Sequence, residues 1–304
     1  MKLIKPSFEI REQPSGLEGV YKQIEGAGRV CYKSEDKIAE GTAKAFVDRM
    51  IASGHGAMLE HGTVYLKCET EVINRYIHPE DGEEEDFNKL EKYEYNSYSV
   101  TNDDGIYLYV TTNLRVLVEN DWLDDLQYIC EPTVYHEKRI TVKFICDRGV
   151  SHEFVRHRVF SFAQESTRYC NYSKDKFDSE CTFIIPCWLN IVEGSYTLED
   201  VEEKYDRCLI TDSGKGITNE AAEYIRSLIY SEKTYFSLLD RNWRPQQARA
   251  VLPNSLKTEL VMTGFVSDWK HFFELRCSSS AHPQARELAI PLQEEFITRG
   301  YINN

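Results

Sequence analysis

The segment from Ile140 to Asn171 passes through three patterns of apolar and polar positions. The first is a period-two alternation that predicts a half-buried strand, with apolar side chains at Ile140, Val142, Phe144 and Cys146. Asp147-Arg148-Gly149 ends that strand, and Ser151 stands where a helix N-cap is expected. We expect a short helical run to present Arg156, His157 and Arg158. Polar side chains then follow at Ser161, Gln164, Glu165, Ser166 and Arg168.

Periodicity predicts both helices and strands in the rest of the chain. Apolar residues at helical spacing predict helices over 36–53, 112–130, 197–211, 218–241, 267–276 and 283–299, and a short helix beginning at Pro245. Thr197 and Asp200 form a candidate capping pair for the helix over 197–211. Alternating runs predict strands over 64–68 and 256–262, and 182–185 is a short apolar segment that Pro186 ends.

The region 79–104 departs from this regularity. The run from Glu80 to Asp86 is almost entirely acidic, so it is too polar to pack and predicts the rim of a surface insertion. We find no internal repeat and no low-complexity linker. The economical prediction is therefore a single domain over residues 1–304 that carries one insertion.

Charge narrows the class of ligand. The 304 residues include 50 Asp and Glu against 36 Lys and Arg, and this balance argues against general affinity for nucleic acid or anionic membranes. The segment 138–176 reverses the balance, with nine Lys and Arg against four Asp and Glu. A basic segment in an acidic protein predicts a focused anion site.

Cysteine usage and hydropathy bear on the compartment. Nine cysteines are present and none forms a CxxC pair. We see no signal peptide and no apolar run long enough to span a bilayer. A reducing cytoplasm is the expected location, with most cysteines acting as small buried apolar residues.

Two groups of histidines raise the question of a metal site. His152 and His157 flank Glu153 in a pattern that resembles a zincin motif, but they are five residues apart. On a helix that spacing turns them about 140° from each other, so they cannot face one ion. His55, Glu60 and His61 are the second group, for which we favour loop or hydrogen-bonding roles. We therefore expect no metal.

Two other readings remain for the segment around residue 156. A cysteine nucleophile would be Cys146 or Cys170 acting with a nearby histidine, although nothing local distinguishes either thiol. Anion and nucleotide binding fits better, because arginine suits bidentate phosphate contacts and several arginines together can neutralise a dianion.

Several motifs in this order resemble the flavin-dependent thymidylate synthases. Arg156-His157-Arg158, followed after seven residues by Ser166, matches the RHRx7S signature of that family. Further segments resemble the family in the same order along the chain: Gly54 to His61, Asp147 to Glu153, Gln164 to Tyr169, Arg249 to Pro253 and Phe272 to Arg276.

The resemblance implies an α+β fold, with mixed helices around a largely antiparallel sheet, and an insertion at about 79–134 relative to the shortest members. It implies an enzyme that methylates dUMP to dTMP. The carbon comes from methylenetetrahydrofolate and the reductant is NADPH, acting through bound FAD. It also implies a homotetramer with active sites shared between subunits, and no cysteine nucleophile.

The resemblance also assigns residues. Arg276 would contact the uracil and stabilise negative charge on its N3–carbonyl system, a sound way to activate a poor carbon nucleophile. The implied dUMP contacts are Glu153, Arg156, Gln164, Glu165, Ser166, Arg168 and Arg249. The implied FAD contacts are Ala57, Arg156, His157, Arg158, Val159, Gln164 and His271.

Three departures from the family pattern affect these assignments. Ala57 stands where Thr or Ser is common, so a side-chain hydrogen bond to FAD is absent there. Phe265 and Ser267 replace the more usual polar and basic residues beside the flavin. Two alternatives stay open: a flavin-free enzyme with a cysteine nucleophile, and a non-catalytic nucleotide-binding protein.

Overall fold

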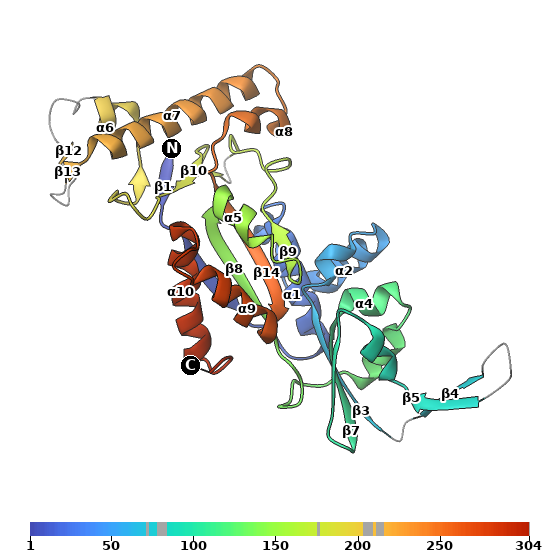
Figure 1. Cartoon of the computed structure of the whole chain (residues 1–304). Helices are drawn as coiled ribbons and strands as arrows, with labels where there is room; N and C mark the ends of the chain where they lie inside the picture. The colour runs from blue at the N-terminus through green and yellow to red at the C-terminus, as the bar shows by residue number, and fades with distance from the viewer. Residues whose placement is uncertain (71–72, 78–83, 175–176, 203–208, 211–215, 304) are drawn as a thin grey trace.

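A computed structural model describes residues 1–70, 73–77, 84–174, 177–202, 209–210 and 216–303. At its centre is a four-stranded antiparallel sheet (Figure 1). The strand order is β2 (Ser7–Arg11), β8 (Arg139–Asp147), β14 (Lys257–Phe265) and β9 (Ser161–Gln164). The register sets Leu260 of β14 opposite Phe144 of β8 and Gln164 of β9.

One face of this sheet carries an aromatic core. The alternation in β8 places Val142, Phe144 and Cys146 on that face, fully buried. Three helices cover it: α5 (Arg148–Phe154), α9 (Val266–Arg276) and α10 (Pro283–Thr298) (Figure 1). Trp269 of α9 is buried and donates its indole N–H to the carbonyl of Ile140 at 3.1 Å. Burial of each large apolar side chain here stabilises the fold by roughly 1.5–3 kcal/mol.

The opposite face of the sheet packs against the N-terminal helices. The helices on the sheet are α1 (Gly16–Val30) and α3 (Gly56–Leu59). Helix α2 (Thr42–Ala52) packs on both of them, and the 3-10 turn η1 (Glu35–Lys37) lies between α1 and α2. Val30 of α1 and Met58 of α3 join one cluster with Val261 of β14 and Ala163 of β9. The sheet therefore separates α3 from α9.

The predicted insertion forms much of a second sheet, of order β3 (Thr63–Glu69), β7 (Tyr107–Asn113) and β6 (Val100–Asp103). Its own core includes Leu66, Tyr93 and Val110. The other elements are the β4 (Ile73–Ile77) and β5 (Glu84–Asn88) hairpin, η2 (Glu91–Tyr95), α4 (Leu114–Glu119) and η3 (Leu123–Tyr128). The acidic run lies outside the described residues over 80–83, and its last three residues belong to β5.

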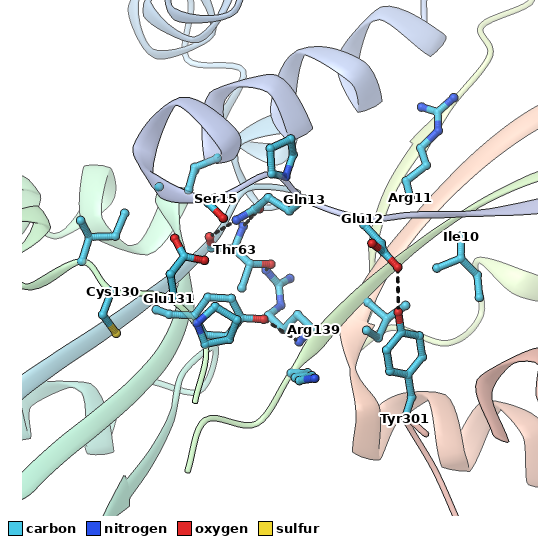
Figure 2. A pocket seen from close by; sticks show the side chains of 18 residues that line it. Ile10, Arg11, Glu12, Gln13, Ser15, Thr63, Cys130, Glu131, Arg139 and Tyr301 are labelled. Carbon is cyan, nitrogen blue, oxygen red and sulfur yellow. Dashed lines mark hydrogen bonds between the residues drawn. The ribbon is translucent and has the colours of Figure 1, made fainter. Parts of the chain in front are cut away.

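A pocket of about 300 Å³ lies where the two sheets meet (Figure 2). Gln13 closes one side, because its amide exchanges two hydrogen bonds of 2.8 Å with the backbone of Thr63. Arg139 lies behind it and donates to the carbonyl of Glu60 at 2.9 Å. Burial lowers the pKa of Arg139 to about 10. The pocket lies away from the residues assigned above to dUMP and FAD.

The remaining elements include a three-stranded sheet around the N-terminal strand and a separate two-stranded sheet. The strands are β1 (Lys2–Ile4), β10 (Thr182–Ile184), β11 (Gly194–Ser195), β12 (Leu209–Ile210) and β13 (Gly216–Ile217). The helices are α6 (Leu198–Glu202), α7 (Asn219–Asp240), α8 (Pro245–Ala248) and the turn η5 (Arg249–Val251). Leu3, Phe183 and Ile225 are fully buried among them.

The α+β prediction with a largely antiparallel sheet is confirmed, and β1 with β10 is a parallel pair. Three predicted helices are wrong in extent. The helix over 36–53 begins only at Thr42, because Gly41 has a φ of 77°. In place of the helix predicted over 112–130 the chain forms the end of β7, then α4, then η3. The strand gives way to α4 at Asn113, because the side chain of that residue caps α4. The helix over 197–211 begins at Leu198 with its Thr197–Asp200 pair, but 209–210 is strand and 203–208 and 211 lie outside the described residues.

A single domain remains a prediction. Among the described residues, every helix is too short or too polar to cross a lipid bilayer.

Candidate active site

The end of β8 fixes the short helix that begins the site. The side chain of Asp147 accepts the backbone N–H of Val150 at 2.7 Å, so Asp147 is the N-cap of α5. Our prediction of Ser151 as the cap is wrong, because Ser151 lies buried within the helix. Gln284 holds the other oxygen of Asp147 at 2.6 Å, and burial raises the pKa of this carboxyl. The helix thus begins at a firmly held residue.

The prediction that a helix presents residues 156–158 is also wrong, because α5 ends at Phe154. A tight turn follows, in which the N–H of His157 bonds to the carbonyl of Phe154 at 3.1 Å. That turn directs His157 inward, where it is 7% exposed, and leaves Arg156, Arg158 and Val159 exposed. Two guanidinium groups therefore flank a buried imidazole.

Three hydrogen bonds hold Arg276 at the end of α9. Its Nε donates to Nε2 of His157 at 2.9 Å, and its Nη1 donates to Oε2 of Glu153 at 2.9 Å. Nη2 donates to the carbonyl oxygen of Glu153 at 2.7 Å. The Arg276 side chain is 16% exposed. Because a guanidinium carries five N–H groups, two of them remain for a ligand.

The electrostatics of this contact require a neutral imidazole. Nε2 of His157 accepts a hydrogen bond, so the ring proton must be on Nδ1. Burial, followed by the charges of Arg276 and His271, lowers the pKa of His157 to about 4. Burial also lowers the pKa of Arg276, while the Glu153 carboxylate opposes that shift.

Gln164 connects the last strand of the sheet to α5. Its amide nitrogen donates to Oγ of Ser151 at 2.9 Å and to Oγ1 of Thr258 at 3.2 Å. The half-buried side chain therefore lies on the α5 face of the sheet, the same face as Glu153 and Arg276. Neither supporting hydroxyl was predicted, because each contact joins residues far apart in sequence.

The side chain of Glu165 points to the opposite side of the sheet from that of Gln164. Its carboxylate accepts from Nζ of Lys257 at 2.8 Å and from the Tyr172 hydroxyl at 3.2 Å, and the residue is 2% exposed. Lys257 also contacts Glu259, which lies beside Lys33 and Lys143 as well. The surrounding lysines hold the pKa of Glu259 far below its usual range in spite of burial. The Glu165 side chain is thus engaged inside the protein.

The next residues form a loop in which Arg168 and Tyr169 are exposed. The N–H of Ser166 bonds to the carbonyl of Cys31 at 3.0 Å, and its hydroxyl accepts the N–H of Arg168 at 3.3 Å. Arg249, just after α8, reaches this loop and donates to Oγ1 of Thr167 at 2.8 Å. The guanidinium groups of Arg168 and Arg249 belong to exposed residues, so the structure gathers two cations beside Ser166.

The two outlying members of the FAD set lie apart. His271 is exposed on α9, and its ring centre is 6.4 Å from that of His157. Ala57 is exposed on α3, which packs on the opposite face of the sheet. One chain therefore does not bring Ala57 together with His271. Phe265 and Ser267 are the two departures beside the flavin. The guanidinium of Arg139 lies over the Phe265 ring, with Cζ 5.5 Å from the ring centre. The N–H of Ser267 donates to the Glu137 carboxylate at 3.0 Å.

The two cysteines considered above as nucleophiles lie in the core. Cys146 and Cys170 are both completely buried, and burial raises the pKa of Cys146. The zincin-like pair also splits, since His152 is exposed and His157 is buried. In the part of the chain that the structure describes, no three His, Cys, Asp or Glu side chains lie close enough together to hold a metal ion.

Comparisons with known proteins converge on one family. The family model "Thymidylate synthase complementing protein" matches residues 120–299, which include every site residue named above except Ala57. The flavin-dependent thymidylate synthase of Corynebacterium aurimucosum is 30% identical over 285 residues, or 93% of this chain and 77% of that protein. The Corynebacterium glutamicum enzyme of the same name is 29% identical over 283 residues, covering 92% and 76%.

A match over about half of the chain and one solved structure can be added. The flavin-dependent thymidylate synthase of Pyrococcus furiosus is 29% identical over 154 residues, which span 51% of this chain and 52% of that protein. Among solved structures, the UMP/dUMP methylase PolB from Streptomyces cacaoi, bound with 5-Br dUMP, aligns over 98% of this chain and 93% of its own. Its identity is 16% and its TM-score 0.41.

Proposed function

This chain belongs to the flavin-dependent thymidylate synthase family, and from that premise we propose that it converts dUMP to dTMP. Methylenetetrahydrofolate would donate the carbon and NADPH the reducing equivalents, with FAD as the bound cofactor. The observation that carries the proposal is the fixed Arg276 guanidinium, which keeps two N–H groups for a ligand beside exposed cations. A cationic site with N–H groups left to donate suits an anionic nucleotide.

The residues assigned to dUMP have separate proposed tasks, and that of Glu153 is to contact the nucleotide while it holds Arg276. Arg168 and Arg249 bind the phosphate through charge-assisted hydrogen bonds, and Ser166 adds a neutral donor. Gln164 and Arg156 orient the base. Arg276 donates to the uracil carbonyl next to N3, so that charge developing on the ring meets a fixed cation. Glu165 contributes its backbone, since its side chain is held by Lys257 and Tyr172.

The residues present fit an anionic flavin dinucleotide. Arg156 and Arg158 are exposed cations on either side of His157, and His271 lies on the same side of the sheet. We propose that these residues, with Val159 and Gln164, hold FAD. When bound, FAD supplies two-electron transfer from NADPH. Ala57 would belong to the site of a second subunit, because it lies on the far face of the sheet, and this supports a homotetramer with shared sites.

The surroundings of the thiols favour this chemistry over a covalent cysteine mechanism. A nucleophilic cysteine must reach its substrate as a thiolate, whereas Cys146 and Cys170 are buried. All eight cysteines in the described part of the chain are free thiols, which fits a reducing compartment, and we propose the cytoplasm.

An absorbance spectrum tests the cofactor. Purified protein should be yellow, or should become so on addition of FAD, and NADPH should bleach the flavin bands under anaerobic conditions. Protein that stays colourless and retains no FAD after gel filtration contradicts the proposal.

A further inference from the structure

A hollow of about 890 Å³ opens on the α1 face of the molecule, between the end of α1 and helix α2. Four of its lining residues are basic, Arg29, Lys33, Lys37 and Arg49, and one is acidic, Asp36. We call this set the cationic hollow. Its charge is opposite to that of the whole chain, whose formal net charge is −14.

Two of the cations form a fixed floor. Arg29 donates from Nε and Nη2 to one oxygen of Glu25, at 2.8 Å and 2.6 Å, and its side chain is 9% exposed. Lys33 contacts Glu35 at 3.2 Å and Glu259 at 2.5 Å. These carboxylates largely neutralise the two cations of the floor. The floor therefore contributes to the shape of the hollow more than to its net charge.

The other two cations lie at the rim. Lys37 and Arg49 are exposed, and no carboxylate of the described residues lies within 4.0 Å of either charge. Lys44, also exposed on α2, differs because it pairs with Asp48 at 2.8 Å and does not line the hollow. Of the four basic residues that line the hollow, Lys37 and Arg49 are therefore the two that a soluble anion can reach without breaking an ion pair with a described residue.

The wall of the hollow is aromatic. Phe46 lies beneath the guanidinium groups of Arg29 and Arg49, whose Cζ atoms are 5.2 Å and 5.7 Å from the ring centre. Gly28 permits this packing, because a Cβ there would lie 2.6 Å from the Phe46 ring. Tyr32 is 41% exposed and gives the hollow a flat surface open to solvent. A planar group can stack on it.

The hollow borders the proposed phosphate loop. The Tyr32 ring packs on Tyr169 with ring centres 5.1 Å apart, and Tyr169 follows Arg168 in the proposed phosphate loop. At the other end the hollow is lined by His55, two residues before Ala57. The hollow therefore lies between two proposed binding segments, the phosphate loop and the start of α3.

We propose that the cationic hollow binds the tail of a cosubstrate in which a planar aromatic group is followed by two or more negative charges. The aromatic group would stack on Tyr32, and the charges would lie beside Lys37 and Arg49. Two cosubstrates of the proposed function share this chemistry: the benzoylglutamate tail of the folate and the phosphorylated adenosine of NADPH. The inference rests on that proposed function.

The test compares Lys37→Gln, Arg49→Gln and the double variant with wild type, all loaded with FAD. Lys44→Gln is the matched control, and Arg49→Lys restores charge. One arm measures KM for the triglutamyl and monoglutamyl folate donors, and the other measures KM for NADPH and NADH. In the double variant we expect the KM for either the triglutamyl folate or NADPH to rise about three- to tenfold, which is what the loss of two partly exposed charge contacts allows. The value of kcat should stay within twofold of wild type.

Each outcome decides the proposal. Loss of the triglutamate preference assigns the hollow to the folate tail, and loss of the NADPH preference assigns it to the phosphorylated adenosine. Equal KM values in the double variant, Lys44→Gln and wild type overturn it. If wild type forms no dTMP, the proposed function fails instead. Equilibrium dialysis of folate triglutamate and of NADPH against the same variants then decides the hollow, because unchanged binding of both ligands contradicts it.

Discussion

Nε of Arg276 donates a hydrogen bond of 2.9 Å to Nε2 of His157, although 119 residues separate the two in the sequence. The contact fixes both the orientation of the guanidinium and the tautomer of the imidazole. Glu153 completes the arrangement from α5 with two more acceptors. The helix α9 and the turn after α5 thereby present one preorganised cation to the site.

Replacing Arg276 with Ala should lower the rate of dTMP formation by about 100- to 1,000-fold, as for the loss of one fixed donor to developing charge. FAD content should stay the same, because the cationic residues assigned to FAD remain. The measurement is initial rate with saturating dUMP. Lys270→Ala, at an exposed position of the same helix, is the control and should retain full activity. An active Arg276→Ala enzyme removes this residue from catalysis.

Acid should weaken the fold through His157. Because burial lowers its folded pKa to about 4 from an unfolded value of 6.5, the unfolded chain binds more protons between those pH values. The stabilisation is complete above pH 6.5 and falls as the pH drops toward 4. At pH 5 it should have lost about 2 kcal/mol relative to pH 7.5. Urea unfolding at both pH values measures this, and His157→Gln should lose about that much less than wild type. An equal loss of unfolding free energy in wild type and His157→Gln would contradict the lowered pKa of His157.

Glu165→Gln separates a structural role from a ligand contact. The carboxylate is buried against Lys257 and Tyr172, so removing its charge should lower the free energy of unfolding by roughly 1–3 kcal/mol. The dissociation constant for dUMP should change less than twofold. Isothermal titration with dUMP and urea unfolding provide the two readouts. Weaker dUMP binding with unchanged stability assigns the side chain to the nucleotide instead.

Arg168→Ala should weaken dUMP binding by the value of one charge-assisted hydrogen bond, about 1.5–3 kcal/mol. The residue is exposed, so the substitution should leave the fold unchanged. Deoxyuridine, which lacks the phosphate, provides the internal control and should bind wild type and variant equally. Lys174→Ala, at an exposed position nearby, should not affect either ligand. Unchanged dUMP affinity in Arg168→Ala excludes this contact.

Shared active sites predict complementation between inactive variants. Ala57 and Arg276 lie on opposite sides of the central sheet, so one site would draw them from different subunits. Mixed oligomers of Ala57→Trp and Arg276→Ala should therefore regain part of the activity that each variant lacks alone. Activity of the mixture no greater than the sum of the two contradicts sharing.

Local patterns predicted the elements in which core-facing apolar residues recur at a regular spacing. The alternation in β8 and the apolar stripe of α7 are both present, since each depends on neighbouring residues. The errors occur at element ends. Asp147 rather than Ser151 caps α5, and Asn113 ends β7 and begins α4, because a single side chain outweighs periodicity at such positions.

The candidate site was predictable as a set of residues but not as an arrangement. Arg156 and Arg168 could be proposed from their density of charge and from the segments that resemble the family. The inward turn of Glu165 depends on Lys257, which is 92 residues away, and no local pattern reveals that pairing. The same holds for Ser151 and Thr258, which together hold Gln164.

The most direct test of the central claim follows one carbon atom. FAD-loaded protein is incubated with dUMP, NADPH and methylenetetrahydrofolate labelled with ¹³C in the methylene group, and the nucleotide product is analysed by mass spectrometry. We predict dTMP with one ¹³C in its methyl group, and no product when FAD is removed or NADPH omitted. Absence of dTMP from the complete mixture, or dTMP that still forms without flavin, contradicts the account.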